Sequence, residues 1–196
     1  MIAAEAVAVV LLAAGTSTRF GPRDKLAEPL DGLALGLHAA RTLGQIPFGA
    51  HIVVGRRGGP DFRPYGFAPV INPDPAAGQS GSISLGLAKA RLADPEAVLI
   101  ALADMPFVTR GHIEALLARY DDAHPVVGSS DQTRASPPVL FGAALFSTLD
   151  LLTGDVGARM LLKTASLVIA PCRELADIDT PADLPSGDAA TGSRSA

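Results

Sequence analysis

Cysteine is nearly absent from this chain of 196 residues, since Cys172 is the only one. One cysteine excludes an intrachain disulfide framework and leaves no zinc-ribbon or Cys-x-x-Cys redox motif, so we expect the Cys172 thiol to be structural. The four histidines, His38, His51, His112 and His124, show no metal-ligand spacing, and we interpret them as structural or exposed.

Charged residues are also scarce, at 18% of the chain, and only three of the sixteen basic residues are lysines. Twenty acidic residues bring the formal net charge to −4, which argues against a surface that neutralises many nucleic-acid phosphates. Long apolar runs are missing too, because the run at 6–14 spans nine residues, without a basic segment before it. We therefore expect no signal peptide and no membrane span, and a cytoplasmic protein that binds neither nucleic acid nor membrane.

Hydrophobic residues are plentiful, at 48% of the chain, and suffice for one sizeable core. Short apolar runs alternate with longer helical patterns, which is typical of βα units and a mostly parallel sheet. We expect strands at 7–13, 51–54, 69–71, 98–102, 126–127 and 167–169, and helices at 35–43, 82–92, 112–120, 142–151 and 158–164. The prediction is a three-layer α/β/α, Rossmann-like domain over 1–184, followed by a flexible Gly-, Ser- and Ala-rich tail over 185–196.

Two helix starts have recognisable capping chemistry. Thr109 is placed to cap the helix at 112–120, with Val108 and Ile113 as a hydrophobic staple across its first turn. Ser80 or Ser82 is the expected cap of the helix that runs to residue 92.

The stretch 12–26 is the most informative part of the sequence. A buried strand leads into a loop of small and hydroxylated residues, and then Arg19, Arg23 and Lys25 follow within seven positions. Such a loop can turn backbone N–H groups and hydroxyls toward a phosphate chain, while Arg19 and Lys25 neutralise its charge. We therefore predict a phosphate site here.

Three common motifs do not fit this loop. A P-loop needs Gly-Lys-Ser/Thr after its fourth spacer, but this chain has Gly15 and then Gly21-Pro22, and Gly-x-Gly-x-x-Gly fails at Ser17 and Phe20. A nucleophile elbow needs glycine at the position of Arg19, which disfavours a serine hydrolase.

The segment instead resembles the signature Leu-Ala-Ala-Gly-x-Ser-x-Arg-Met-Gly-x-x-Lys of nucleotidyltransferases similar to molybdenum cofactor cytidylyltransferase, within the MobA-like NTP transferase family. The chain departs from it at Phe20, where methionine is usual, and this change keeps an apolar contact; Lys25 also stands one residue later than in the signature. The resemblance implies that the loop cradles a triphosphate and that Arg19 and Lys25 bind it and act in catalysis. It also implies that alanine at position 14 favours CTP, since Ala-Gly-Gly is more typical of guanylyl transfer. The nucleotide-binding residues of the loop are then Leu12, Ala13, Ala14, Gly15, Thr16, Ser17, Arg19 and Lys25.

Asp104 comes directly after the apolar run at 98–102, at the strand end where ligands of open α/β sheets collect. A carboxylate there is poorly solvated unless it meets a cation, and nucleotide-bound Mg²⁺ is a natural partner. A cap of the following turn would also explain an Asp before a proline-containing loop, and position alone favours neither interpretation. The segment 102–106 resembles the family's Leu-x-Asp-Met-Pro, whose Asp binds the metal, and this implies a catalytic, metal-binding role for Asp104.

A second acidic segment lies at 177–183. Alternation places Asp177 and Asp179 on the same side of an extended stretch, while Thr180 to Asp183 reads as the capped start of a final helix. Capping accounts for Asp183. The segment resembles one that closes the chain near the active site in the family, which makes Asp179 the second expected metal ligand.

Other loops resemble the family less closely. The loop 72–82 resembles one from which Gly78, Gln79 and Ser80 would read the base or ribose, although ordinary loop chemistry competes with this interpretation. Ser136-Pro137 replaces the family's Gly-His and puts its acceptor contact in doubt. The segment 154–159 matches the family better, and Asp155 and Arg159 would border the acceptor or simply belong to a helix entry.

These observations together predict a Mg²⁺-dependent nucleotidyltransferase. It would transfer CMP from CTP to a small phosphorylated acceptor such as molybdopterin and release pyrophosphate, with a molybdoenzyme as a further partner. Two alternatives stay open: transfer to another phosphate acceptor or from GTP, and a non-catalytic maturation factor that binds the nucleotide or the cofactor.

Overall fold

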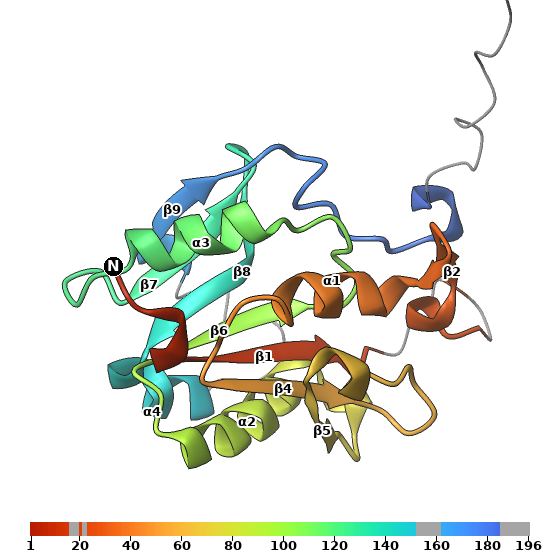
Figure 1. Cartoon of the computed structure of the whole chain (residues 1–196), viewed down its shortest axis with the longest axis horizontal. Coiled ribbons are helices and arrows are strands. Elements are labelled where there is room, and N and C mark those ends of the chain that lie inside the picture. Colours follow the sequence, from red (N-terminus) through yellow and green to blue (C-terminus); the bar gives the residue numbers. More distant parts are fainter. Residues whose placement is uncertain (16–19, 21–22, 152–161, 185–196) are drawn as a thin grey trace, which may run out of the picture.

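The computed structural model describes residues 1–15, 20, 23–151 and 162–184, and a central sheet organises this part of the chain (Figure 1). Within the described residues the sheet has seven strands, in the order β5-β4-β1-β6-β8-β7-β9. They are β1 (Val7–Ala13), β4 (Ala50–Gly55), β5 (Ala68–Ile71), β6 (Ala97–Leu102), β7 (Val126–Ser130), β8 (Ala135–Gly142) and β9 (Ser166–Ile169). Strand β8 runs antiparallel to β6 and β7, whereas the other paired neighbours run parallel, so the sheet is mostly parallel as predicted.

Helices cover both faces of the sheet, as Figure 1 shows, and this confirms the predicted layers. Helices α1 (Leu35–Leu43) and α3 (Arg110–Arg119) pack on one face with the odd-numbered residues of β1, Val7, Val9 and Leu11. Helices α2 (Gln79–Ala90) and α4 (Phe146–Asp150) pack on the other with the even-numbered ones, Ala8, Val10 and Leu12. Strand β1 is buried on both faces, which explains its unbroken apolar sequence.

Short elements complete the described part of the chain. A two-stranded ribbon pairs β2 (Pro29–Leu30) with β3 (Leu33–Ala34). The 3-10 turns are η1 (Ala4–Ala6), η3 (Lys25–Ala27), η4 (Arg63–Tyr65), η5 (Pro75–Ala77), η6 (Arg91–Ala93), η7 (Ala143–Leu145), η8 (Leu162–Thr164) and η9 (Pro181–Asp183).

The expected strands and helices are largely present, and β8 is the main omission. Proline cannot donate to a β-ladder, so Pro137 and Pro138 are unusual residues inside a strand. The pairing accommodates them at an irregularity, because Gly128 pairs with Val139 while the next residue, Ser129, pairs with Ser136. The helix expected at 142–151 is shorter, and of the one expected at 158–164 only the 3-10 turn η8 lies within the described residues.

One of the two predicted helix caps is correct. The Thr109 hydroxyl accepts a hydrogen bond from the His112 amide at 3.2 Å. Neither Ser80 nor Ser82 caps α2, because Gly78 precedes its first residue with φ 95°. Ser82 lies inside the helix and accepts a hydrogen bond from the Asn72 side chain at 2.9 Å. The cap prediction failed because Gly78 starts the helix earlier than the apolar pattern indicated.

Helix α2 lies unusually close to the sheet. A Cβ atom on its Gly86 would stand 2.3 Å from Val10 Cγ1, so only glycine fits.

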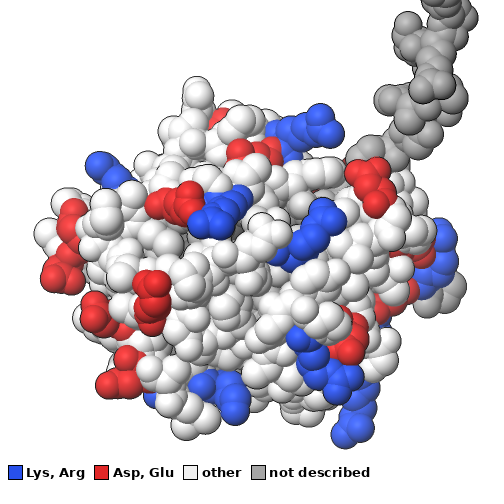
Figure 2. Space-filling model, viewed as in Figure 1, with Lys and Arg blue, Asp and Glu red and all other residues white. Residues whose placement is uncertain are grey.

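On the face shown in Figure 2, Lys and Arg side chains are interspersed with Asp and Glu. In the described ranges we find no helix of the length and apolarity needed to span a bilayer.

Candidate active site

The candidate site lies where β1 and β6 end. These strands are parallel neighbours, and the Ala103 amide donates to the Leu12 carbonyl at 3.0 Å just past their ends. The backbone therefore places Ala14 and Gly15, which follow β1, beside Asp104, which follows β6. This is the sheet edge at which open α/β folds bind ligands.

Lys25 is held at this edge by a capped turn. Asp24 precedes η3, and its Oδ1 accepts a hydrogen bond from the Leu26 amide at 3.1 Å. The same oxygen lies 2.9 Å from Arg56 Nη2, so Arg56, which follows β4, fixes the cap. Sequence patterns did not point to Arg56, because its partner lies more than thirty residues earlier in the chain.

The Lys25 ammonium joins two carboxylates that are distant in sequence. Lys25 Nζ lies 2.8 Å from Asp104 Oδ2 and 3.1 Å from Asp179 Oδ1, while only 7% of the lysine is exposed. Burial alone would lower the pKa of Lys25, but the charges and hydrogen bonds of Asp104 and Asp179 outweigh it and raise the pKa above its ordinary value. The lysine is therefore cationic at neutral pH.

The chain's last described segment delivers Asp179 to this cluster. The Ile178 amide donates to the Asp104 carbonyl at 2.9 Å, and the Ile178 side chain is buried, so the two segments are fixed side by side. Asp183 Oδ2 accepts hydrogen bonds from Thr180 Oγ1 and from the backbone amides of Thr180 and Asp179. These bonds lower the pKa of Asp183. The predicted capping box is present, although η9 is one 3-10 turn rather than a longer helix.

The two carboxylates fit a divalent cation. Asp104 Oδ1 is buried and has no hydrogen-bond partner among the described residues, so an acceptor in this cluster is left for a ligand. The described ranges contain no group of three or more His, Cys, Asp or Glu side chains arranged for a metal. Two carboxylates nevertheless suit Mg²⁺, which protein sites usually hold through one or two carboxylates plus substrate phosphates and water.

A hollow of about 320 Å³ opens beside Asp104. Its lining includes five of the predicted nucleotide-binding residues, together with parts of the loop before α2. The lining residues are Leu12, Ala14, Gly15, Pro75, Ala76, Gly78, Gln79, Ser82, Leu102 and Asp104. Ala13, Lys25 and Ser80 are not in this lining. Ala13 borders a smaller hollow near Arg56, Lys25 is buried against Asp104 and Asp179, and Ser82 lines the hollow where Ser80 was expected. Thr16, Ser17 and Arg19 lie outside the described residues.

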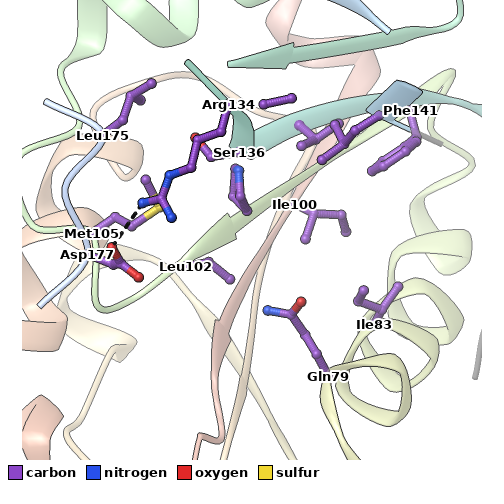
Figure 3. A pocket seen from close by; sticks show the side chains of 14 residues that line it. Gln79, Ile83, Ile100, Leu102, Met105, Arg134, Ser136, Phe141, Leu175 and Asp177 are labelled. Carbon is purple, nitrogen blue, oxygen red and sulfur yellow. Dashed lines mark ion pairs between the residues drawn. The ribbon is translucent and has the colours of Figure 1, made fainter. Parts of the chain in front are cut away.

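A second and larger hollow, of about 410 Å³, adjoins the first, since Gln79 and Leu102 line both (Figure 3). Apolar side chains form most of its wall, and the polar ones are Gln79, Arg134, Ser136 and Asp177. Arg134 Nη2 lies 3.5 Å from Asp177 Oδ1. Neither residue was among the predicted site residues, although the alternation of Asp177 with Asp179 indicated a shared side. Asp155 and Arg159, predicted near the acceptor, lie outside the described residues.

The histidines keep to structural or surface positions in the described chain. Buried His112 contacts Ser129 Oγ at 2.7 Å, and that hydroxyl donates to the Pro138 carbonyl at 2.8 Å. Burial lowers the pKa of His112 against the opposing charge of Glu174, so its imidazole is neutral near pH 7. This bridge fastens α3 to the irregular pairing of β7 and β8.

Comparisons with known proteins agree with this architecture. A family model described as a MobA-like NTP transferase domain matches residues 9–170. The purine catabolism protein PucB of Bacillus subtilis (strain 168) is 34% identical over 189 residues, which cover 88% of this chain and 91% of PucB.

Solved structures share the fold at lower sequence identity. A nucleotidyl transferase from Methanothermobacter thermautotroptrophicus (Mth528) matches with a TM-score of 0.73 and 22% identity, over 90% of this chain and 93% of that one. Rv0371c from Mycobacterium tuberculosis H37Rv, in a complex with manganese, matches with a TM-score of 0.61 and 19% identity, over 84% and 88% of the two chains.

Proposed function

This chain belongs to the MobA-like NTP transferase family, and we propose that it transfers CMP from CTP to the phosphate of a small acceptor of the molybdopterin type, with release of pyrophosphate. Membership of the family implies an NTP and an acceptor as substrates. The choice of CTP rests on Ala14 in the Leu-Ala-Ala-Gly segment. A molybdoenzyme that takes up the product is the proposed partner.

One observation carries the proposal: a buried cationic lysine lies between two carboxylates beside a hollow lined by the two predicted nucleotide loops. A lysine at this position offers a positive charge to a triphosphate, and the carboxylates offer oxygens to its metal ion. These are the parts that phosphoryl chemistry needs, because its catalysis rests on positioning and electrostatic stabilisation.

In the proposed reaction an acceptor phosphate oxygen attacks the α-phosphorus of the NTP, opposite the leaving group. The bond from the α-phosphorus to the bridging oxygen breaks, and its electron pair leaves with pyrophosphate. Lys25, helped by Arg19, neutralises the negative charge that the pyrophosphate gains. Gly15 with Thr16 and Ser17 hold the phosphates, while Gly78, Gln79 and Ser80 are proposed to contact the base or ribose. The acceptor phosphate is already ionised, so no side chain has to remove a proton.

Asp104 and Asp179 are the proposed holders of Mg²⁺. When bound, the ion supplies positive charge shared between the phosphate oxygens. Support comes from the unpartnered Asp104 Oδ1 and from the manganese complex of the structural relative. Asp104 and Asp179 would hold the ion through their carboxylate oxygens, and Lys25, which contacts both, would supply a further positive charge beside it.

The test compares CTP, GTP, ATP and UTP, each with Mg²⁺, first by thermal shift of the full chain and then by pyrophosphate release with molybdopterin. CTP should give the largest shift and should support pyrophosphate release. A larger effect of GTP would overturn the proposed donor, and release only with another phosphate compound would overturn the acceptor. Binding of CTP and molybdopterin without any pyrophosphate would identify a non-catalytic maturation factor, and stabilisation by no nucleotide would refute the whole proposal.

A further inference from the structure

The larger hollow has two chemically different ends. Its deep wall is apolar and includes Ile83, Ile100 and Phe141, whereas the guanidinium of Arg134 lies at the other end beside Met105 and Asp177 (Figure 3). Its volume of about 410 Å³ falls within the range of ligand pockets, roughly 300–1,000 Å³. A ligand that fills it needs an apolar or flat heterocyclic body and one anionic end.

The polar end of this hollow faces the proposed NTP site around Lys25 and Asp104. Asp177, which holds Arg134, is two residues from Asp179, which contacts Lys25, and the intervening Ile178 amide is bonded to the Asp104 carbonyl. The chain segment 177–179 therefore carries two cation–carboxylate groups next to each other. A phosphate bound at Arg134 would therefore lie at the end of the hollow that is nearer to Asp104 and Asp179, the proposed metal ligands.

Arg134 is presented by an organised turn. Asp131 Oδ1 accepts hydrogen bonds from Thr133 Oγ1 at 2.7 Å and from the amides of Thr133 and Arg134 at 2.9 Å each. The hydroxyl and amide donors lower the pKa of Asp131 to about 2. The backbone of Arg134 is therefore fixed at every pH near neutrality.

The ion pair that Arg134 makes is easily exchanged. The two charged groups are 3.5 Å apart, and 65% of the Arg134 side chain and 41% of the Asp177 side chain are exposed. Exposed pairs of this kind contribute little to stability, so a stronger anion can displace the carboxylate. A phosphate accepts two parallel hydrogen bonds from guanidinium, which a carboxylate at this distance does not obtain.

From these observations, and resting on the proposed function, we propose that Arg134 binds the phosphate of the acceptor and that Asp177 occupies the guanidinium until the acceptor arrives. The acceptor class is a phosphomonoester on a flat, largely apolar body of the size of a bicyclic ring. Ser136 and Pro137 line the same hollow, and we expect this wall to take part in acceptor choice.

The experiment titrates 1-naphthyl phosphate into the full chain and follows the probe's fluorescence, which suits a chain without tryptophan. 1-Naphthol, which is also fluorescent, tests the ring alone, and inorganic phosphate, added as a competitor of 1-naphthyl phosphate, tests the anion alone. The wild-type chain should bind 1-naphthyl phosphate more tightly than either fragment. Equal affinity for 1-naphthyl phosphate and 1-naphthol would overturn the proposal.

Variants separate Arg134 from general surface charge. Arg134→Ala should weaken binding of 1-naphthyl phosphate about tenfold, as expected for a lost charged hydrogen bond, and Arg134→Lys should restore part of it. Asp177→Asn should tighten binding about two- to fivefold, because the competing carboxylate is neutralised. Arg63→Ala is the matched control, since Arg63 forms an exposed pair with Asp61 at 2.8 Å, and it should change nothing. Unaltered affinity in Arg134→Ala would refute the assignment.

Thermal shifts with CTP and Mg²⁺, measured on the same variants, distinguish this inference from the proposed function. The CTP shift should be equal in the wild-type and Arg134→Ala chains, and with molybdopterin only the acceptor's KM should rise. Normal CTP binding without an Arg134 effect would overturn this inference alone. Arg134-dependent binding of 1-naphthyl phosphate without any nucleotide shift would overturn the proposed function alone.

Discussion

Lys25 and Arg134 are each paired with carboxylates from one short segment, yet their surroundings differ. The Lys25 side chain is 9% exposed and contacts Asp104 and Asp179, whereas the Arg134 side chain is 65% exposed and pairs with Asp177. Removing Lys25 would leave the carboxylates of Asp104 and Asp179, whose side chains are 25% and 42% exposed, close together without their counterion, which is costly. An exposed pair loses little when it breaks. The buried group is suited to a permanent role in catalysis, and the exposed pair to exchange with a ligand.

The largest expected difference between the two regions is in turnover. Lys25→Ala or Asp104→Ala should lower kcat about 10²-fold or more, the scale of losing one preorganised electrostatic group. Pyrophosphate release under saturating CTP and acceptor measures this. Lys89→Ala, which removes an exposed lysine of α2, is the control and should leave kcat unchanged. Near wild-type kcat in Asp104→Ala with Mg²⁺ present would refute its metal-binding role.

Substitutions of the neighbouring carboxylates Asp179 and Asp177 should change different kinetic parameters. Asp179→Asn should lower kcat about tenfold, equivalent to about 1.4 kcal/mol, because one of the two proposed metal-binding charges is lost. Asp177→Asn should instead lower the acceptor's KM. Asp150→Asn is a matched control for Asp179, because its side chain is similarly exposed and also pairs with an arginine, Arg91. The same kinetic effect from both site variants would contradict the division of roles.

Arg56 tests whether the support of Lys25 matters. Arg56→Ala removes the 2.9 Å contact with Asp24, the cap of the Lys25 turn, and should cost about 1–3 kcal/mol of stability together with a severalfold loss of kcat. Chemical denaturation and pyrophosphate release measure the two effects. Arg57→Ala, which changes the exposed neighbour, should do neither. If Arg57→Ala has an equal effect, the contact with Asp24 is not the cause.

Alkaline pH should reduce the stability that the Lys25 ammonium gives to the folded chain through Asp104 and Asp179. Although burial opposes it, Asp104 and Asp179 raise the folded-state pKa of Lys25 above 10.5. The stability that the lysine contributes is therefore complete below the unfolded-state pKa and is lost as the pH rises through the folded-state pKa. The difference in Tm between the wild-type and Lys25→Met chains should be constant from about pH 7 to 9 and should shrink above about pH 10.5. A constant difference at all these values would contradict the raised pKa.

Added salt should give the smallest effect on the kinetics, and it should act on the exposed Arg134–Asp177 pair and not on the group around Lys25. Raising KCl from about 0.05 to about 0.5 M shortens the screening length severalfold, so the acceptor's KM should rise a few-fold. The ratio of kcat between the wild-type and Lys25→Ala chains should not change, because the buried group is poorly screened. A salt-dependent ratio would place Lys25 in solvent.

Sequence patterns predicted the parts of the fold that are locally determined. Strand β1 and helix α1 have the expected ends, because unbroken burial and a helical apolar period leave a direct trace in the sequence. Strand β8 was missed. Prolines are rare inside strands because they cannot donate a backbone hydrogen bond, and here the irregular pairing of β8 with β7 accommodates them. Local sequence patterns predict an element well only where its pairing with neighbouring elements is regular.

The candidate site was predicted residue by residue but not as an arrangement. Asp104 and Asp179 were recognised as acidic groups at strand and loop ends, yet nothing local indicated that Lys25 lies between them. The Arg134–Asp177 pair was missed for the same reason, since it depends on how the chain after β9 crosses the β7–β8 turn. Such contacts between distant segments arise from topology, which a pattern of neighbouring residues does not encode.

The reversed direction of β8 has a consequence for how substrate choice can change. Because β7 and β8 form an antiparallel pair, the turn at residues 131–134 lies at the same sheet edge as the ends of β1 and β6. A hairpin turn can be lengthened, shortened or resequenced without re-routing any strand, whereas the loops after β1 and β6 are tied to the packing of whole βα units. The proposed acceptor side is thus the exchangeable part of the molecule, and grafting turns from relatives tests whether acceptor choice can change while the proposed catalytic residues stay the same.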